Sequence, residues 1–297
     1  MSTEVPGDGA GLSIKAVSDL LAVPAPTIRS WERRYGLPKS SRTAGGHRRY
    51  SPADVATLRL MRDEVNSGRR PADAAALVRD TSDSQAPHRP LIEAFLHVTQ
   101  TLSARELDSL LDRCRDRLGI EETIAGVVLP GMREVGLAWQ TGEYDTAQEH
   151  LVTQATRGWL KKILFLGPVP WHRQTIVLCC GPAELHTIGL EAMEVLLSQR
   201  GWECHMLGEN TPPDALTAAI RRTAAAAAIV VSHIGKNRGA AIASIRLTDL
   251  LSIQVFYAGN AFLAPPARTG IPGTYLGEDL RVAVDIVSHS LQETERP

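Results

Sequence analysis

The chain has 297 residues, of which 43% are hydrophobic and 22% are charged, and its formal net charge is -1. This length predicts two or three domains that each bury a core, and the near-neutral balance excludes a uniformly basic nucleic-acid coat or an acidic tail. The opening residues MSTEVPGDGAG lack the basic and apolar regions of a signal peptide, the cysteines form no C-x-x-C pair, and no apolar run approaches the ~20 residues of a membrane helix, so we expect a soluble, cytoplasmic protein.

Residues 11–80 are predicted to form a winged helix-turn-helix. One helix is expected after Ser13, a turn at Val23-Pro24, and a second helix from about Pro26 to Tyr35, because proline suits the first turn of a helix. The stretch GGHRRY then has the glycines and basic residues of a hairpin wing. Between residues 25 and 50, seven basic residues stand against one acidic residue, which is typical of a phosphate-binding surface. A solvated charged surface on a helical domain is the alternative for the charge run alone.

The ordered combination of RSWERRYGL and GGHRRY resembles the DNA-binding domain of MerR-family regulators. The resemblance covers about the first quarter of the chain. It implies double-stranded operator DNA as a partner and makes Trp31 and Tyr50 packing residues. The DNA-binding residues that it implies are Thr27, Arg29, Arg33, Tyr35, His47, Arg48 and Arg49.

After a polar linker over residues 81–90, residues 91–168 show apolar positions at helical spacing. Four helices with short connections are expected, which predicts a four-helix bundle. The expected helices are LIEAFLHVTQTL, ARELDSLLDRCRDRL, IEETIAGVVLPGMREVGLAW and TAQEHLVTQATRGWLKKILFL.

Strand and helix patterns alternate over residues 169–297, which predicts a Rossmann or flavodoxin-like α/β domain with a parallel sheet. His186 follows the first strand, at the edge of the sheet where ligands bind. Glu184 can hydrogen-bond the far nitrogen of a ligating imidazole, and Gly189 lets the backbone approach a bulky ligand. A flavodoxin-like domain without a ligand is an alternative. A receiver-like domain is a weaker one, because LCCGPAEL lacks an acidic cluster.

The Glu184, His186 and Gly189 spacing resembles the DxHxxG motif of cobalamin-binding domains, with Glu184 in place of the aspartate. The resemblance implies that His186 is the lower axial ligand of cobalt. It also implies that Ser232 and Gly259 line the pocket for the nucleotide tail of the corrinoid, with Asn260 where a second glycine is common.

The stretch WQTGEYDTAQEH contains Trp139, Glu149 and His150, and Asp145 with Gln148 predicts a capped helix start. Adjacent helical residues diverge by ~100°, so Glu149 and His150 can contact one object only if it is broad. A core tryptophan with a surface Glu-His pair is the alternative.

The W-x9-EH spacing resembles that of the CarH/LitR group of light-responsive regulators, and the resemblance spans essentially the whole chain. It implies 5′-deoxyadenosylcobalamin bound between bundle and sheet domain, with Trp139, Glu149 and His150 on the adenosyl group. It further implies a repressor that is a tetramer in the dark and leaves DNA in the light. That group carries an upper-ligand histidine after the tryptophan, and here the residue is Gln140.

Two other interpretations stay open from the sequence. One is a cobalamin- or partner-responsive MerR-type regulator without light switching, which Gln140 and Asn260 leave open. The other is a corrinoid methyl carrier, against which the basic wing argues. We expect no enzyme, because no nucleophile and base pair is recognisable and the cysteines fall in core or strand positions.

Overall fold

The computed structural model describes residues 11–38, 40–43, 46–66 and 68–295. The chain divides into two compact units, Met1–Pro87 and His88–Pro297. Lys39 and Gly45, which belong to the basic segment and the predicted wing, lie outside the described residues. In the described part of the chain, no helix is long and apolar enough to cross a membrane.

The first unit contains the predicted helix-turn-helix and wing. The Ser13 hydroxyl accepts a hydrogen bond from the Ala16 N–H at 3.2 Å and so begins the first helix, while Gly36 ends the second in a left-handed conformation (φ 69°). The elements in chain order are α1 (Ile14–Leu21), α2 (Ala25–Tyr35), β1 (Ser41–Arg42), β2 (Arg48–Arg49), α3 (Pro52–Asn66) and α4 (Pro71–Gln85). Strands β1 and β2 pair antiparallel and form the wing. Trp31 and Tyr50 are buried in the core of this unit, as predicted.

The prediction of an irregular linker over residues 81–90 is wrong in its secondary structure. Helix α4 extends to Gln85, a 3-10 turn covers Ala86–His88, and α5 (Arg89–Gln100) begins directly afterwards. Polar composition suggested a loop, but serine and aspartate have only modestly unfavourable helix propensity, so they do not by themselves end a helix. The division between the two units still falls within this stretch.

Four helical segments follow, as predicted: α5, α6 (Ala104–Leu118), a continuous segment from Ile120 to Thr141, and α9 (Thr146–Phe165). The third segment consists of α7 (Ile120–Thr123), a π turn (Ile124–Val128) and α8 (Leu129–Thr141). The π turn is a local departure from the expected α-helix. At its centre, a Cβ on Gly126 would lie 2.6 Å from the His88 ring, so glycine is what lets that ring pack there.

The α/β part of the second unit has the element order that the sequence predicts. Its sheet is five-stranded in the order β4-β3-β5-β6-β7, and every pairing is parallel. The elements are β3 (Thr175–Cys180), α10 (Ile188–Gln199), β4 (Glu203–Gly208), α11 (Pro213–Thr223), β5 (Ala227–Val231), α12 (Arg238–Asp249), β6 (Gln254–Ala258), β7 (Thr274–Tyr275) and α13 (Leu280–Glu295). Short 3-10 turns at Gly235–Asn237, Asn260–Phe262 and Pro265–Arg268 lie between them.

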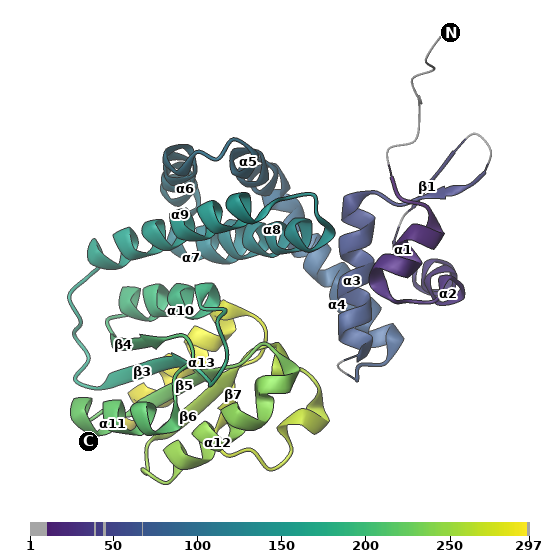
Figure 1. The fold of residues 1–297 in the computed structure, drawn as a ribbon. Coiled ribbons are helices and arrows are strands. Elements are labelled where there is room, and N and C mark those ends of the chain that lie inside the picture. The colour runs from purple at the N-terminus through teal and green to yellow at the C-terminus, as the bar shows by residue number, and fades with distance from the viewer. Residues whose placement is uncertain (1–10, 39, 44–45, 67, 296–297) are drawn as a thin grey trace. The chain divides into compact units, whose positions relative to one another are not determined.

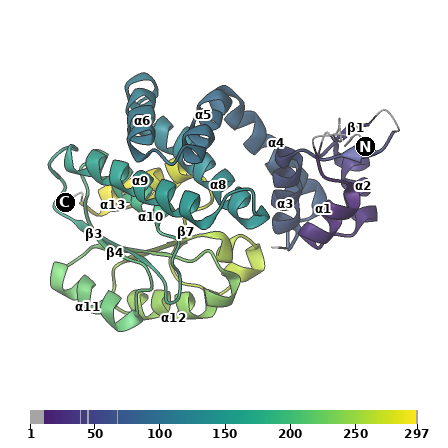
Figure 2. The ribbon, with the colours of Figure 1, turned by 45° about the horizontal axis from the view of Figure 1, so that its top comes forward.

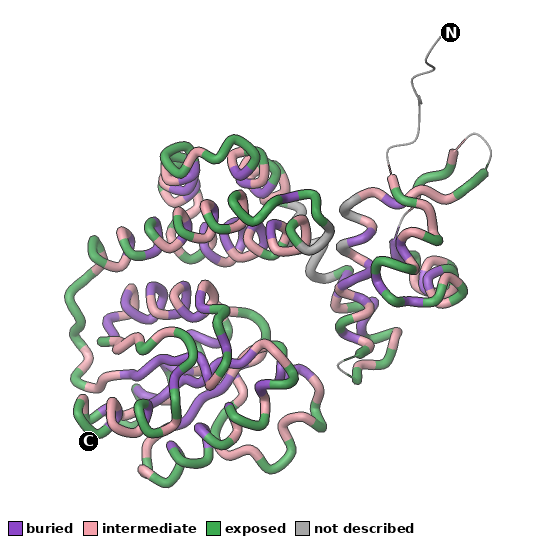
Figure 3. Tube along the Cα trace, viewed as in Figure 1, coloured by how far each residue is buried: buried purple, intermediate pink, exposed green. Residues whose placement is uncertain are grey.

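Alternate residues of the inner strand β3 belong to different cores. Ile176 and Leu178 pack in one core with α10, α13 and the helical bundle, whereas Val177 and Cys179 pack in the other with α11 and α12. Figure 1 shows these two helical layers on opposite faces of the sheet, and Figure 3 shows buried residues along the central strands and α10. A fully buried parallel sheet requires such cover on both faces. The bundle therefore packs on the same side of the sheet as α10 and α13.

Candidate functional site

Helix α2 presents a basic face to solvent in the first unit. Arg29, Arg33 and Arg34 are exposed, while Ile28 and Trp31 on the other face are buried. Thr27 and Tyr35 are half-buried, and His47 is exposed in the wing. In DNA-binding helix-turn-helix proteins, the exposed face of the second helix is the surface that enters the major groove.

Arg48 and Arg49 are less accessible than the helix arginines. The Arg48 Nε donates to Glu32 Oε2 at 2.6 Å, and Glu32 Oε1 accepts from the Tyr50 hydroxyl at 2.9 Å and from the Ser40 hydroxyl at 2.7 Å. Burial, together with the bond to Glu32, raises the pKa of Tyr50, so this phenol remains a donor. Glu32 thus ties the recognition helix to the wing. Sequence reasoning missed this role, although Glu32 is the lone acid of the basic segment.

A second group of predicted residues lies at the carboxyl ends of β3, β5 and β6. We call Glu184, His186, Ser232 and Gly259 the sheet-side residues. Glu184 is fully buried, and its Oε1 lies 2.5 Å from His186 Nδ1. Its Oε2 accepts from the backbone N–H of His233 at 2.6 Å and of Ile234 at 3.0 Å. One carboxylate therefore joins the loop after β3 to the loop after β5, and the predicted contact between Glu184 and His186 is confirmed.

These hydrogen bonds fix the charge of Glu184. Burial alone would raise the pKa of this carboxyl, but the bonds from the His186 ring and from the backbone of His233, His186 and Ile234 outweigh it and lower the pKa to about 2. Because Nδ1 is held by a carboxylate, the other ring nitrogen of His186, Nε2, is the one available to a metal. The His186 side chain is 66% exposed, so this nitrogen has access to a ligand.

The chemistry of the remaining sheet-side residues fits the tail of a bulky cofactor. The Ser232 hydroxyl is buried and, among the described residues, has no hydrogen-bond partner. At Gly259, with φ 105°, an added Cβ would lie 2.2 Å from the Ser232 carbonyl oxygen, so only glycine permits this approach. Gly189 lies in the first turn of α10 and not in the loop where it was expected, and a Cβ there would meet nothing within 4 Å.

The single imidazole of His186 suits a metal that is already held by a macrocycle. Within the described residues, no three histidine, cysteine, aspartate or glutamate side chains converge on a possible metal position. A single oriented imidazole can add one axial bond to a metal held by a macrocycle, but it cannot chelate a free ion. The sheet-side residues therefore fit a cobalt corrinoid.

We call Trp139, Glu149 and His150 the bundle-side residues. Asp145 and Gln148 form the predicted capping box at the start of α9, and Trp139 lies in the last turn of α8. Trp139 is 46% exposed and the His150 side chain is 73% exposed. The Glu149 carboxylate accepts from the Thr153 hydroxyl at 2.9 Å. The Gln140 side chain lies outside what the structure describes.

Helix α9 brings the two groups within one unit. Arg157 of α9 contacts Thr187, the residue after His186, and His150 lies seven residues earlier, about 10 Å along the helix. Glu149 and His150 thus lie on a helix that is fixed to the loop carrying His186.

One residue near this site was missed by the sequence analysis. The His233 ring lies edge-on to the His186 ring, with centroids 6.2 Å apart, and burial lowers the pKa of His233 even though Glu184 opposes the change. His233 directly follows Ser232, which is the signal that could have identified it.

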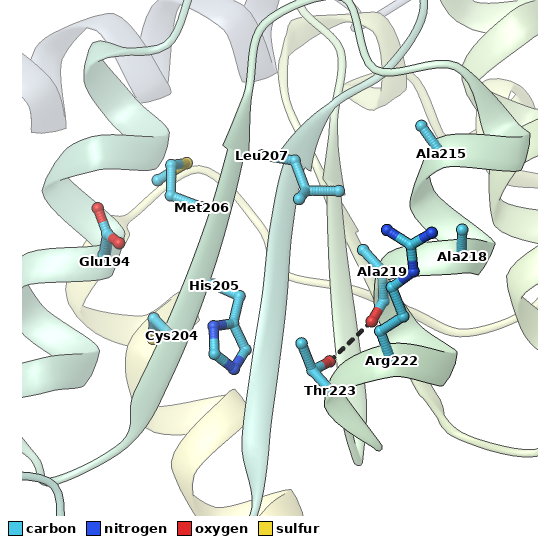
Figure 4. A pocket seen from close by; sticks show the side chains of 10 residues that line it. All are labelled: Glu194, Cys204, His205, Met206, Leu207, Ala215, Ala218, Ala219, Arg222 and Thr223. Atoms are coloured by element: carbon cyan, nitrogen blue, oxygen red, sulfur yellow. Dashed lines mark hydrogen bonds between the residues drawn. The ribbon is translucent and has the colours of Figure 1, made fainter.

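The pocket in Figure 4 lies away from all of these residues. It has a volume of about 710 Å³ and opens along the outer strand β4 between α10 and α11, with Cys204, His205 and Met206 on its floor. Burial raises the pKa of Glu194 at its rim to about 7, and Glu191 adds to the effect. Burial also raises the pKa values of the Cys179, Cys180 and Cys204 thiols, which disfavours the reactive thiolate form.

Two family models match separate parts of the chain. A family model described as MerR HTH family regulatory protein matches residues 12–81, and one described as B12 binding domain matches residues 91–163. The structure of the Methanosarcina barkeri monomethylamine corrinoid protein is similar in fold, with a TM-score of 0.56 and 14% identity over 68% of this chain and 96% of that protein.

Two transcriptional repressors of Myxococcus xanthus are similar over most of their length. The chain is 31% identical over 221 residues to the HTH-type transcriptional repressor CarH, which covers 70% of this chain and 74% of that repressor. It is also 31% identical over 212 residues to the HTH-type transcriptional repressor CarA, with 70% and 72% covered.

A MerR-type helix-turn-helix joined to a B12-binding domain defines a DNA-binding transcriptional regulator with a cobalamin-binding module, and not an enzyme. The chain belongs to the CarH family of HTH-type transcriptional repressors. The predicted family and fold class are confirmed.

Proposed function

We propose that the chain is a light-responsive repressor that binds operator DNA in the dark as an oligomer, expected to be a tetramer, with adenosylcobalamin as its light-absorbing ligand. The observation that carries this proposal is the pairing of a buried, ionised Glu184 with an accessible His186 beside the unpartnered Ser232 hydroxyl. When bound, adenosylcobalamin supplies a cobalt–carbon bond that green or shorter-wavelength light cleaves.

Different residues of the chain would bind different parts of the cofactor. His186 would bind the cobalt of the corrinoid, and Ser232 and Gly259 would receive its nucleotide tail. Trp139, Glu149 and His150 would contact the adenosyl group, so its departure removes contacts made only in the dark state. A ligand shifts an equilibrium only through such differential contacts, and several DNA-binding units in one oligomer bind operator DNA more tightly than one.

The first test is size-exclusion chromatography with visible absorption spectra. Wild-type protein and the His186→Ala variant are mixed with adenosylcobalamin in the dark and run again after green light. We expect a coloured wild-type oligomer that dissociates on illumination, and a variant that loses the colour. A colourless wild-type peak would overturn the proposed ligand.

A regulator that binds cobalamin without light switching is the second candidate. Gln140 favours it, because glutamine is a poor cobalt ligand where related regulators carry histidine. A coloured oligomer whose size does not change on illumination would establish this candidate in place of the first.

The DNA-binding surface is tested with operator DNA selected in vitro by the wild-type protein. Arg29→Ala removes an exposed guanidinium from the recognition helix, and we expect roughly a tenfold loss of affinity in mobility shifts with unchanged oligomer size. Arg70→Ala is the matched control, because Arg70 is 84% exposed in the same unit but pairs with Asp73 outside the basic segment. Equal affinity for both variants would remove Arg29 from the interface.

A further inference from the structure

One face of helix α9 carries a line of polar side chains from the bundle-side residues toward the sheet. Glu149, Thr153 and Arg157 are four residues apart, so they share this face. The Thr153 hydroxyl donates to Glu149 at 2.9 Å. Both ribbon views show α9 running alongside α10, the helix that begins just after His186 (Figures 1 and 2).

Arg157 ends this line on the loop of His186. Its Nη2 donates to the Thr187 hydroxyl at 2.5 Å, and its Nε donates to Glu191 Oε1 at 3.0 Å. Thr187 in turn donates to the same Glu191 oxygen at 2.6 Å. Thr187 is 4% exposed, and the Arg157 and Glu191 side chains are 26% and 15% exposed. This closed triangle is shielded from solvent, where charge-assisted hydrogen bonds are stronger than at an open surface.

His186 is therefore held from two directions. On one side, Glu184 fixes its ring and its backbone N–H to the loop after β5, which belongs to the sheet. On the other side, its neighbour Thr187 is bound by Arg157, which belongs to the bundle. Any displacement of α9 relative to the sheet must break the triangle or move the backbone next to His186.

Other ion pairs between bundle and α/β part do not reach this loop. Arg281 of α13 donates to Glu122 of α7 at 3.0 Å, and Arg200, next to the end of α10, lies 3.4 Å from Glu121. These pairs hold the two parts together by the same chemistry but away from His186. A variant at one of these pairs therefore shows what is lost when bundle and α/β part are held together less strongly, without a change at the loop of His186.

We propose that Arg157 is a positioning residue that couples helix α9 to the loop of His186. A group bound against the bundle-side residues and axial binding by His186 then alter one another's free energy, and the coupling is reciprocal. The inference rests on the proposed cobalamin function, but the physical link can be measured without any ligand.

The first measurement uses the full chain without cobalamin. Hydrogen exchange followed by mass spectrometry is compared for wild type, Arg157→Ala, Thr187→Val and the control Arg281→Ala. We expect faster exchange in peptides covering residues 184–190 for the first two variants and unchanged exchange there for the control. Equal protection in Arg157→Ala and wild type would overturn the link.

The second measurement uses adenosylcobalamin and hydroxocobalamin as probes. For each protein we take the ratio of the two dissociation constants and the visible spectrum of bound hydroxocobalamin, which reports axial coordination. We expect Arg157→Ala to reduce the preference for the adenosyl form by roughly fivefold or more, with partial recovery in Arg157→Lys. Arg281→Ala should retain the wild-type ratio.

The two proposals fail in different ways. A wild-type protein that binds neither cobalamin refutes the proposed function, and hydrogen exchange then decides the link by itself. A wild-type protein that binds both forms while Arg157→Ala and Arg281→Ala shift the ratio equally refutes the coupling and leaves the function intact. Non-additive effects of Arg157→Ala and Thr187→Val in the double variant would support the direct contact.

Discussion

The sheet-side and bundle-side residues differ in burial and in how firmly hydrogen bonds hold them. Glu184 is fully buried and accepts hydrogen bonds from two loops, so His186 is oriented before any ligand arrives. Trp139 is 46% exposed, and His150 has a 73% exposed side chain whose carboxylate neighbour, Glu149, lies 3.6 Å away. Under the proposed function, the pre-oriented sheet side would retain the ligand and the exposed bundle side would sense the group that departs.

The largest expected effect is on the pH dependence of the free energy of unfolding, which reports how firmly Glu184 is held on the sheet side. The folded pKa of Glu184 is about 2 and its ordinary value is 4.5, so ionised Glu184 stabilises the folded state above pH 4.5 by roughly 3 kcal/mol. This contribution is lost as the pH falls from 4.5 toward 2, because the unfolded chain then binds the proton first. Urea unfolding from about pH 6 to pH 3 should show a steeper loss for wild type than for Glu184→Gln. Parallel curves would mean that Glu184 is not held as described.

A second prediction concerns ligand retention by the same carboxylate. Glu184→Gln replaces a carboxylate that accepts from four backbone N–H groups with an amide, so His186 loses its fixed orientation. We expect the affinities for adenosylcobalamin and hydroxocobalamin to fall together by ~10- to 100-fold in spectroscopic titrations. Glu203→Gln, at an exposed glutamate of β4, is the control and should bind both as wild type does. A loss of affinity for adenosylcobalamin alone would contradict the proposed division of roles between the sheet side and the bundle side.

The opposite selectivity is expected on the bundle side. Trp139→Ala removes apolar surface that only an adenosyl group would cover, so affinity for adenosylcobalamin should fall by roughly tenfold while hydroxocobalamin binds as before. Trp171→Ala removes another exposed tryptophan, 60% accessible in the connection between α9 and β3, and should change neither affinity. Equal weakening of both ligands by Trp139→Ala would show that the tryptophan contacts the corrin ring itself.

The sequence predicted the parts of these sites that depend on local pattern. The position of His186 follows from a buried strand ending before it, and the capping box of Asp145 and Gln148 follows from residue spacing. The partners that complete the sites come from distant segments. Glu184 meets His233 and Ile234 across 49 and 50 residues, which no local pattern encodes. The roles of the individual cofactor and DNA residues stay predictions.

The same limit explains what was missed in the basic segment and the linker. Charge counting treated Arg48 as a free cation, but the fold brings it to Glu32 sixteen residues away. The linker expectation relied on polar composition, and the helical pattern on either side continued through it. Arg157 belongs to an ordinary amphipathic helix by sequence, and only packing of α9 on α10 shows its contact with Thr187.

The smallest expected effect comes from Glu194, a half-buried glutamate of the same α/β part that contrasts with Glu184. Glu194, at the rim of the β4 pocket, is half-buried, and burial together with the like charge of Glu191 raises its pKa from 4.5 to about 7 against the opposing effect of Lys161. The folded state therefore holds this proton more tightly than the unfolded chain does. Protonated Glu194 stabilises the fold fully below pH 4.5, and that contribution is lost as the pH rises through about 7.

Glu194→Gln should accordingly raise the free energy of unfolding at about pH 8 by about 1 kcal/mol, less than the full shift implies because the side chain is partly solvated. The gain should vanish below pH 4.5, where both side chains are neutral. Urea unfolding at the two pH values measures it. Glu184→Gln and Glu194→Gln would then change the free energy of unfolding in opposite directions at neutral to alkaline pH. The Glu184 carboxylate is surrounded by N–H donors, whereas the Glu194 carboxylate is partly buried beside the like charge of Glu191. A destabilised Glu194→Gln at alkaline pH would mean that the β4 rim also contains a donor that prefers the ionised form.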